Sequence, residues 1–160
     1  MKRRLRLSAN GMDGNGRNPL AEASGPVFLG MDAGSTTTKA VLIDQEGRIL
    51  WQFYESNAGN PVNLAVTMLQ SLYKQIPSAA HIARSLSTGY GEGLFQAAFG
   101  VDAGEVETIA HHRAADFFLP GVEFLLDIGG QGMKCFFVKD GSTITMYEPS
   151  SPSSAASEFK

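Results

Sequence analysis

Two glycine-rich turns, each opened by an aspartate, constrain the fold of this chain most. The first, Gly30–Lys39, reads GMDAGSTTTK, and the second, Leu125–Lys134, reads LLDIGGQGMK. Each turn joins two apolar segments, so a strand, acidic turn, strand unit occurs twice, with the two aspartates 95 residues apart. Glycines let backbone N–H groups converge on a phosphate, and a carboxylate beside such a turn can hold Mg²⁺. One hairpin of this kind is weak evidence, but two facing hairpins predict a nucleotide held from both sides.

Composition narrows the class of protein. The chain has 160 residues, 43% of them hydrophobic, which fits one globular domain, and its net charge of −3 gives no electrostatic footprint for nucleic acid. No apolar run approaches the length that spans a membrane. The single cysteine, Cys135, excludes an intrachain disulfide and fits a reducing compartment. We therefore expect a cytoplasmic protein without a nucleic-acid or membrane partner.

Apolar periodicity and turn residues predict the elements. A capping Asn60 precedes a helix that begins at Pro61 and is stopped by Pro77. Alternating or continuous apolar runs predict strands, and apolar residues at helical spacing predict two further helices. The strands are expected at 27–32, 39–44, 48–55, 82–88, 124–127, 133–140 and 142–147, and the further helices at 92–99 and 107–118.

The order of these elements predicts an α/β fold. Three strands joined by hairpins and then helical crossovers make a mixed sheet with helices on its faces, in the order β-β-β-α-β-α-α. A second β-β-β follows, as if a duplicated half were beginning. We expect a flexible leader at 1–26, a nucleotide-binding domain at 27–145, and a disordered tail rich in Ser, Pro and Ala at 146–160.

Four segments carry a resemblance to a known family. They occur in order, with the family's approximate spacing, over roughly residues 27–145. The chain resembles the actin, sugar-kinase and heat-shock-70 ATPase fold, and within it the BadF/BadG/BcrA/BcrD-type ATPases. These ATPases include activators of 2-hydroxyacyl-CoA dehydratases and subunits of benzoyl-CoA reductase. The segments are 30–39, 87–91, 105–111 and 127–131.

The resemblance implies a fold and an activity. The fold is a ribonuclease-H-like mixed sheet followed by the first hairpin of a second half. In the family, ATP binding and hydrolysis with Mg²⁺ change the angle between the halves. A [4Fe–4S] cluster, held by cysteines from both subunits of a dimer, then donates an electron to an acyl-CoA dehydratase or reductase. The resemblance therefore implies ATP, such an enzyme and a second copy of the chain as partners.

For the first turn, the resemblance implies one side of a phosphate site. Asp32 would position Mg²⁺ and help to order the attacking water. Lys39 would reach the transferred phosphate as a point charge. The donors to the β- and γ-phosphates would come from Gly34, Ser35, Thr36 and Thr37. The alternative is a hairpin whose glycine and hydroxyl residues only satisfy the turn.

The second turn would form the opposite clamp. Asp127 would be the second carboxylate near Mg²⁺, beside the loop residues Gly129, Gly130 and Gln131. Its alternative is an aspartate that caps an ordinary turn. Gly89 would lie in a strand-to-helix turn lining the nucleotide cleft. Glu107 would polarise the lytic water, or it would only complement the dipole at the start of its helix.

The sequence departs from the family in its last part. Gly132 stands where the family carries an aspartate, and the Ser/Pro tail replaces a Cys/Gly-rich segment. The ligands of the [4Fe–4S] cluster are therefore absent, and we expect Cys135 to be a small buried apolar residue. A truncated or frameshifted reading frame would explain this loss of pattern.

Two further interpretations concern the histidines and the activity. The adjacent His111 and His112 point about 100° apart on a helix, so we expect solvated or core-edge histidines and no metal pair. Two other functions stay open: a small-molecule kinase such as a sugar kinase, and a nucleotide-binding fragment that does not hydrolyse ATP.

Overall fold

The computed structural model describes residues 17–128, 133–139 and 142–147. The chain forms two compact units, an amino-terminal unit that ends at Glu107 and a carboxyl-terminal unit that begins at Thr108. The predicted tail and most of the predicted leader lie outside the described residues. No helix among the described residues combines the length and apolarity needed to cross a membrane.

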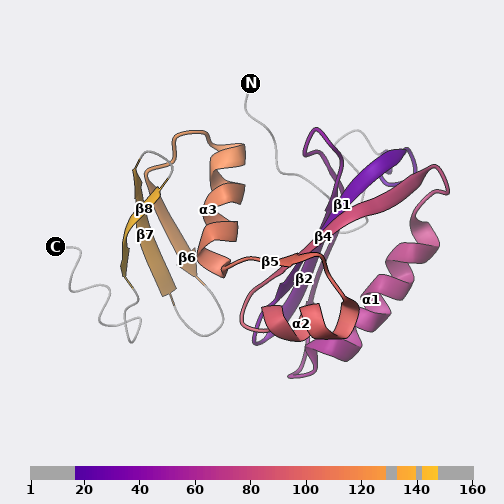
Figure 1. Cartoon of the computed structure of the whole chain (residues 1–160), viewed down its shortest axis with the longest axis horizontal. Coiled ribbons are helices and arrows are strands. Elements are labelled where there is room, and N and C mark those ends of the chain that lie inside the picture. The colour runs from indigo at the N-terminus through magenta and orange to yellow at the C-terminus, as the bar shows by residue number, and fades with distance from the viewer. Residues whose placement is uncertain (1–16, 129–132, 140–141, 148–160) are drawn as a thin grey trace. The chain divides into compact units, whose positions relative to one another are not determined.

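The amino-terminal unit is built on a five-stranded mixed sheet (Figure 1). Its central strand, β1, pairs antiparallel with β2 and parallel with β4; β3 and β5 are the outer strands, giving the order β3-β2-β1-β4-β5. Because β1 and β4 are parallel, they end at the same edge of the sheet, where α/β proteins usually bind ligands. The strands are β1 (Gly25–Ala33), β2 (Thr37–Ile43), β3 (Ile49–Ser56), β4 (Ala80–Thr88) and β5 (Ala103–Gly104).

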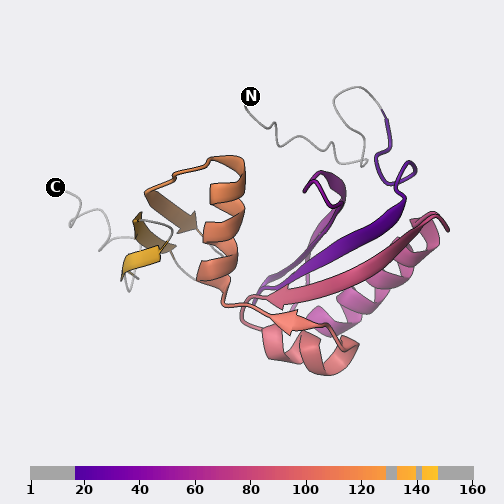
Figure 2. The same ribbon diagram turned by 45° about the horizontal axis from the view of Figure 1, so that its top comes forward.

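Two helices, α1 (Pro61–Gln75) and α2 (Glu92–Phe99), cover one face of this sheet. Burial alternates along β1, as expected for a strand with one face on the core. Figure 2 shows α1 lying along this layer. The core joins Val27, Leu29 and Met31 of β1 to Met68 and Leu72 of α1 and Phe95 of α2. Asp32 and Lys39 alternate with these core residues, so they lie on the opposite face of the sheet.

Local signals explain where α1 begins and ends. The side chain of Asn60 accepts a hydrogen bond from the backbone N–H of Asn63 at 3.3 Å, and Pro61 is the first helical residue. Ile76, which precedes Pro77, has extended backbone angles and ends the helix. The sequence-based bounds of this helix are confirmed.

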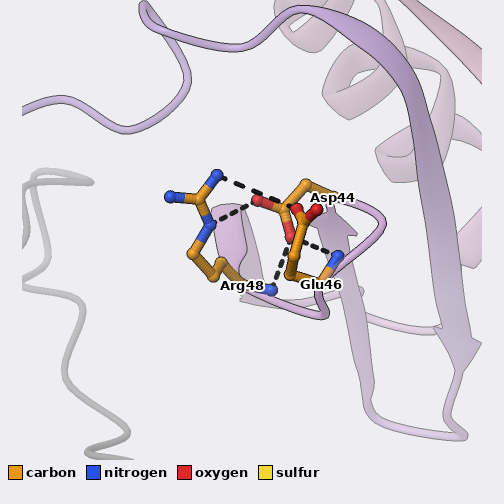
Figure 3. A network of polar contacts seen from close by, with 3 residues as sticks. All are labelled: Asp44, Glu46 and Arg48. Atoms are coloured by element: carbon orange, nitrogen blue, oxygen red, sulfur yellow. Dashed lines mark hydrogen bonds and ion pairs between the residues drawn. The ribbon is translucent and has the colours of Figure 1, made fainter.

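An aspartate closes the turn between β2 and β3 (Figure 3). Asp44 Oδ1 accepts hydrogen bonds from the backbone N–H groups of Glu46 and Arg48, at 3.1 and 2.8 Å. Asp44 Oδ2 accepts one from Arg48 Nε at 2.6 Å, and this hydrogen bond and the aspartate charge raise the pKa of Arg48. The carboxylate thus replaces missing backbone partners in the turn.

The described part of the carboxyl-terminal unit contains one helix, α3 (Glu107–Phe118), which belongs to this unit from Thr108 onward. It also contains a three-stranded antiparallel sheet of order β6-β7-β8. Its strands are β6 (Phe124–Ile128), β7 (Met133–Lys139) and β8 (Ser142–Tyr147). In β6 the odd and even positions face opposite sides, and Asp127 pairs with Lys134 of β7.

The predicted fold class and the order of the elements are confirmed, with two differences. β5 is an additional strand of two residues, too short to give a sequence pattern. In addition, Leu20 and Ala23, which we assigned to a flexible leader ending at residue 26, are 2% and 7% exposed and belong to the core. That prediction is wrong for residues 17–26, because two well-spaced apolar side chains anchor a segment that otherwise looks polar.

Candidate functional site

The first predicted site residues, Asp32 and Lys39, are neighbours across two strands. They are direct partners in the antiparallel register of β1 and β2. Lys39 Nζ donates a hydrogen bond to Asp32 Oδ2 at 2.7 Å, and the two side chains are 39% and 13% exposed. A charge-assisted bond of this length fixes both side chains at the edge where β1 ends.

The surroundings keep Lys39 positively charged. Partial burial lowers the pKa of Lys39, but the hydrogen bond and charge of Asp32 raise it more, with smaller contributions from Tyr54 and Glu107. The net result is a pKa above the ordinary 10.5, so the ammonium group is charged at neutral pH. Its Nζ also lies 5.8 Å from the centre of the Tyr54 ring, within reach of a cation–π interaction.

The second oxygen of Asp32 lacks a donor. Oδ1 is buried, and it accepts no hydrogen bond from any of the described residues. A buried carboxylate oxygen without a partner is energetically unfavourable unless a cation or water satisfies it. Oxygen is the ligand that Mg²⁺ prefers, so Asp32 fits a role in holding this ion.

Gly89 makes room for that oxygen. It has φ +88°, and a Cβ at this position would collide with Asp32 Oδ1 and lie 3.0 Å from the backbone of Ala33. The turn after β4 is tied to the end of β1, because the Gly91 N–H donates to the Ala33 carbonyl at 2.9 Å. The predicted strand-to-helix turn therefore lies directly beside Asp32.

The loop between β1 and β2 contains the four predicted phosphate-binding residues. Gly34 is required there, since a Cβ would lie 2.7 Å from the carbonyl oxygen of Thr37. Ser35 and Thr37 are half-buried and Thr36 is exposed. The carbonyl groups of Gly34 and Thr36 accept hydrogen bonds from Asn57, at 2.9 and 3.0 Å.

The remaining predicted residues belong to two different units. Glu107 is the last residue of the amino-terminal unit and contributes to the raised pKa of Lys39. Asp127 lies on β6, where its Oδ2 is 3.1 Å from Nδ1 of His111 on α3. Gly129, Gly130, Gln131 and Gly132 lie outside the described residues. Cys135 is 2% exposed, which confirms its assignment as a buried residue.

The sequence analysis missed three residues that contact the predicted site residues or their loop. Asn57 was not connected with the first loop, although asparagine side chains commonly form hydrogen bonds to the backbone of turns. The cation–π partner Tyr54 followed only from the register of β2 and β3. We expected His111 to be solvated or at the edge of a core, and its contact with Asp127 joins residues 16 positions apart. No local pattern identifies that contact.

Comparisons with known proteins place this chain among similar sequences. Residues 29–157 match the model of the BadF/BadG/BcrA/BcrD ATPase family. An uncharacterized protein of Methanocaldococcus jannaschii is 32% identical over 74% of this chain and 46% of its own length. The (R)-2-hydroxyglutaryl-CoA dehydratase activating ATPase of Acidaminococcus fermentans is 28% identical over 75% of this chain and 45% of its own length.

Solved structures show a similar fold. The activator of the 2-hydroxyisocaproyl-CoA dehydratase from Clostridium difficile, with bound ADPNP, has a TM-score of 0.64 at 24% identity, over 77% of this chain and 45% of that one. The (R)-2-hydroxyglutaryl-CoA dehydratase component A of Acidaminococcus fermentans has a TM-score of 0.63 at 25% identity, over 77% and 47%.

The mixed sheet and its neighbours define a protein with the actin-like ATPase fold. Within that fold, the chain belongs to the BadF/BadG/BcrA/BcrD ATPase family, which confirms the resemblance identified from the sequence. The chain spans 43–46% of the length of the curated relatives it matches.

Proposed function

We propose that this chain is the ATP-binding module of an activator of a CoA-ester dehydratase or reductase. The observation that carries the proposal is the Asp32 carboxylate: one oxygen is bonded to Lys39 and the other is buried without a donor beside Gly89. Family membership supports ATP as the proposed nucleotide. The dehydratase-activating ATPase among the relatives supports the proposed kind of partner enzyme.

In this proposal each side chain of the first loop has a definite task. Asp32 Oδ1 would hold Mg²⁺, directly or through water, and the ion would neutralise charge on the phosphates. The backbone and hydroxyl donors of residues 34–37 would bind the β- and γ-phosphates. Lys39, whose ammonium is charged at neutral pH, would turn from Asp32 toward the transferred phosphate.

The other carboxylates are assigned by the same resemblance. Asp127, with Gly129, Gly130 and Gln131, would form the opposite clamp and a second carboxylate near Mg²⁺. Glu107 would orient the lytic water, and its contribution to the pKa of Lys39 supports a place near the charged part of the site. All of these groups act by positioning and electrostatics, which supply most of the catalysis in phosphoryl transfer.

The residues of this chain do not fit a [4Fe–4S] cluster. Such clusters are held mainly by cysteine thiolates, and the only cysteine of the chain, Cys135, is 2% exposed. We therefore assign no electron-transfer step to this chain. A homodimer and a dehydratase or reductase partner belong to the proposal for the complete activator.

Titration calorimetry with ATP and Mg²⁺ tests the proposed binding. We expect Mg²⁺-dependent binding, weakened at least tenfold in Asp32→Ala and also weakened in Asp127→Ala, because each variant loses a carboxylate assigned to the cation. Asp102→Ala is the matched control, since that exposed carboxylate binds Arg84 and Ser85 and has no assigned role. Wild-type affinity in both Asp32→Ala and Asp127→Ala would refute the two-loop site.

Phosphate release separates the three functions. An ATPase releases phosphate without an added acceptor, whereas a kinase needs its sugar or other small molecule. Binding of ATP without release under either condition supports a nucleotide-binding module that does not hydrolyse. The incomplete coverage of the relatives leads us to expect slow release or none from this chain alone.

A further inference from the structure

Asn57 is a buried polar residue next to the first loop, although it belongs to the connection between β3 and α1. It is only 4% exposed, so its amide group needs partners inside the protein. Its Nδ2 donates to the carbonyl of Gly34 at 2.9 Å, and its Oδ1 accepts from the N–H of Gly59 at 3.0 Å. Both ends of the amide are therefore used, and each bond joins a different segment.

The backbone of Asn57 adds two more bonds. Its N–H donates to the carbonyl of Thr36 at 3.0 Å, and its carbonyl accepts from the N–H of Asn60 at 2.7 Å. Asn60 is the residue that caps α1. Asn57 thus connects the loop between β1 and β2 to the start of a helix that is anchored in the core.

These bonds determine which way two loop amides point. In a planar trans peptide the N–H points opposite to the carbonyl of the same peptide unit. Because Asn57 binds the carbonyls of Gly34 and Thr36, the N–H groups of Ser35 and Thr37 are directed away from Asn57. A loop that binds phosphate needs its N–H groups held in fixed directions before the ligand arrives.

The connection that carries Asn57 has an uncommon shape. Ala58 has φ +48° and Gly59 has φ +80°, so two consecutive residues adopt the left-handed conformation. Alanine rarely adopts this conformation and keeps it only where the surroundings impose it. This bend brings the Gly59 N–H to Oδ1 of Asn57, which leaves Nδ2 facing Gly34.

We propose that Asn57 is a positioning residue of the phosphate-binding loop, acting through the carbonyl of Gly34 to direct the N–H of Ser35. This inference rests on the proposed nucleotide binding. It adds a residue outside the glycine-rich segments and links the loop to α1.

The test compares three variants of the full chain. Asn57→Ala removes both side-chain bonds without adding charge, and Asn57→Asp keeps the acceptor for Gly59 but loses the donor to Gly34. We expect both to weaken the binding of ATP with Mg²⁺ on the order of tenfold or more, because the carbonyl of Gly34 is released. Asn60→Ala is the control: it removes the cap of α1, so the unfolding midpoint falls while the affinity stays unchanged.

Amide hydrogen exchange, measured by NMR without nucleotide, gives a second readout. The Ser35 amide should exchange faster in Asn57→Ala than in the wild type, and at the wild-type rate in Asn60→Ala. In the folded wild type, titration with ATP and Mg²⁺ should shift the Ser35 and Thr37 amide resonances. This titration uses only the wild type, so it does not depend on whether a variant folds.

The outcomes separate the two proposals. Absence of binding by the wild type refutes the proposed function, while the exchange of Ser35 still reports on Asn57. If Asp32→Ala loses affinity and Asn57→Ala does not, the positioning role is overturned and nucleotide binding stands. Equal losses of affinity in Asn57→Ala and Asn60→Ala, or unshifted Ser35 and Thr37 amides, also overturn the positioning role.

Discussion

Each unit of this chain contains an antiparallel strand pair, β1–β2 or β6–β7, but the two units bury their apolar residues very differently. In the amino-terminal unit, α1 and α2 cover one sheet face, and strand and helix residues form one buried cluster. In the carboxyl-terminal unit, α3 has no buried residue, and only Cys135, Phe136 and Val138 are buried among its described side chains. One face of β6 stays open: Phe124, Leu126 and Ile128 are 42%, 49% and 73% exposed.

The difference indicates that a strand, turn and strand unit forms from local sequence, whereas the burial of its apolar side chains depends on the elements that cover it. Alternation along β6 separates Leu125 and Asp127 from the exposed apolar side chains. The exposed set forms a contiguous apolar strip with Phe137, which faces Phe124 across the pair with a ring distance of 5.1 Å. Such a strip favours association when it lacks a covering element.

The largest expected effect comes from Phe95. It is fully buried and lies edge-to-face with Phe99 at 5.3 Å, so Phe95→Ala should destabilise the amino-terminal unit by about 3–5 kcal/mol. Trp51, the only tryptophan, reports unfolding of this unit by fluorescence in urea. Phe124→Ala is the control, and we expect it to leave the Trp51 transition unchanged. A shift of that transition in Phe124→Ala would show that the two units unfold together.

The contrast also predicts different protection of backbone amides. Hydrogen exchange should be slower in the strands β1, β2 and β4 than in β6 and β7, by on the order of a hundredfold, since protection follows the free energy of local opening. Mass spectrometry of peptic peptides measures both regions in one sample. Uniform protection through Tyr147 would contradict this contrast between the two units.

One glycine in each unit allows the two units to be compared at single positions. Gly89 and Gly121 have φ +88° and +81°, but a Cβ at Gly121 meets nothing within 4 Å. Gly121→Ala should cost about 1 kcal/mol for the backbone conformation alone. Gly89→Ala should cost more, roughly 2–3 kcal/mol, because it also displaces Asp32 and presses on Ala33. Equal effects, each measured on the urea midpoint of the unit that carries the glycine, would mean that Asp32 moves away freely.

The smallest expected effect is the pH dependence that Lys39 contributes. Its pKa is raised in the folded protein, so its stabilising contribution is complete below pH 10.5 and is lost as the pH rises through the folded value. Lys39→Met should remove this alkaline loss, which we expect to stay below about 1 kcal/mol since the side chain is 39% exposed. The measurement is the urea midpoint between pH 9 and 11. A wild-type and a Lys39→Met protein with the same alkaline slope would contradict it.

Local signals predicted much of the fold. The bounds of α2 and α3 follow from the apolar spacing of their residues and agree with the structure. The cap at Asn60 and the turn at Gly47 also act within a few residues, so the sequence carries them directly.

Contacts between distant segments could not be predicted in the same way. The two-residue β5 exists because Ala103 pairs with Leu86 of β4, and the bonds of Asn57 to the first loop depend on the β2–β3 register. At the candidate site, both Asp32 and Lys39 were predicted from the sequence. Their bond to each other and the unsatisfied Oδ1 required coordinates, since they follow from pairing and burial.

The central place of β1 has a consequence for the order in which the site assembles. The hairpin with β2 closes over a few residues, whereas the parallel pair Asp32–Thr88 joins positions 56 residues apart. Chain closure over that distance is entropically slower, so we expect the charged pair to form early and the Gly89 turn to dock late. Folding kinetics of Val41→Ala and Leu86→Ala measure this, with the higher φ-value expected at Val41. A nascent chain would then hold the Lys39–Asp32 ion pair before the Gly89 turn packs beside it.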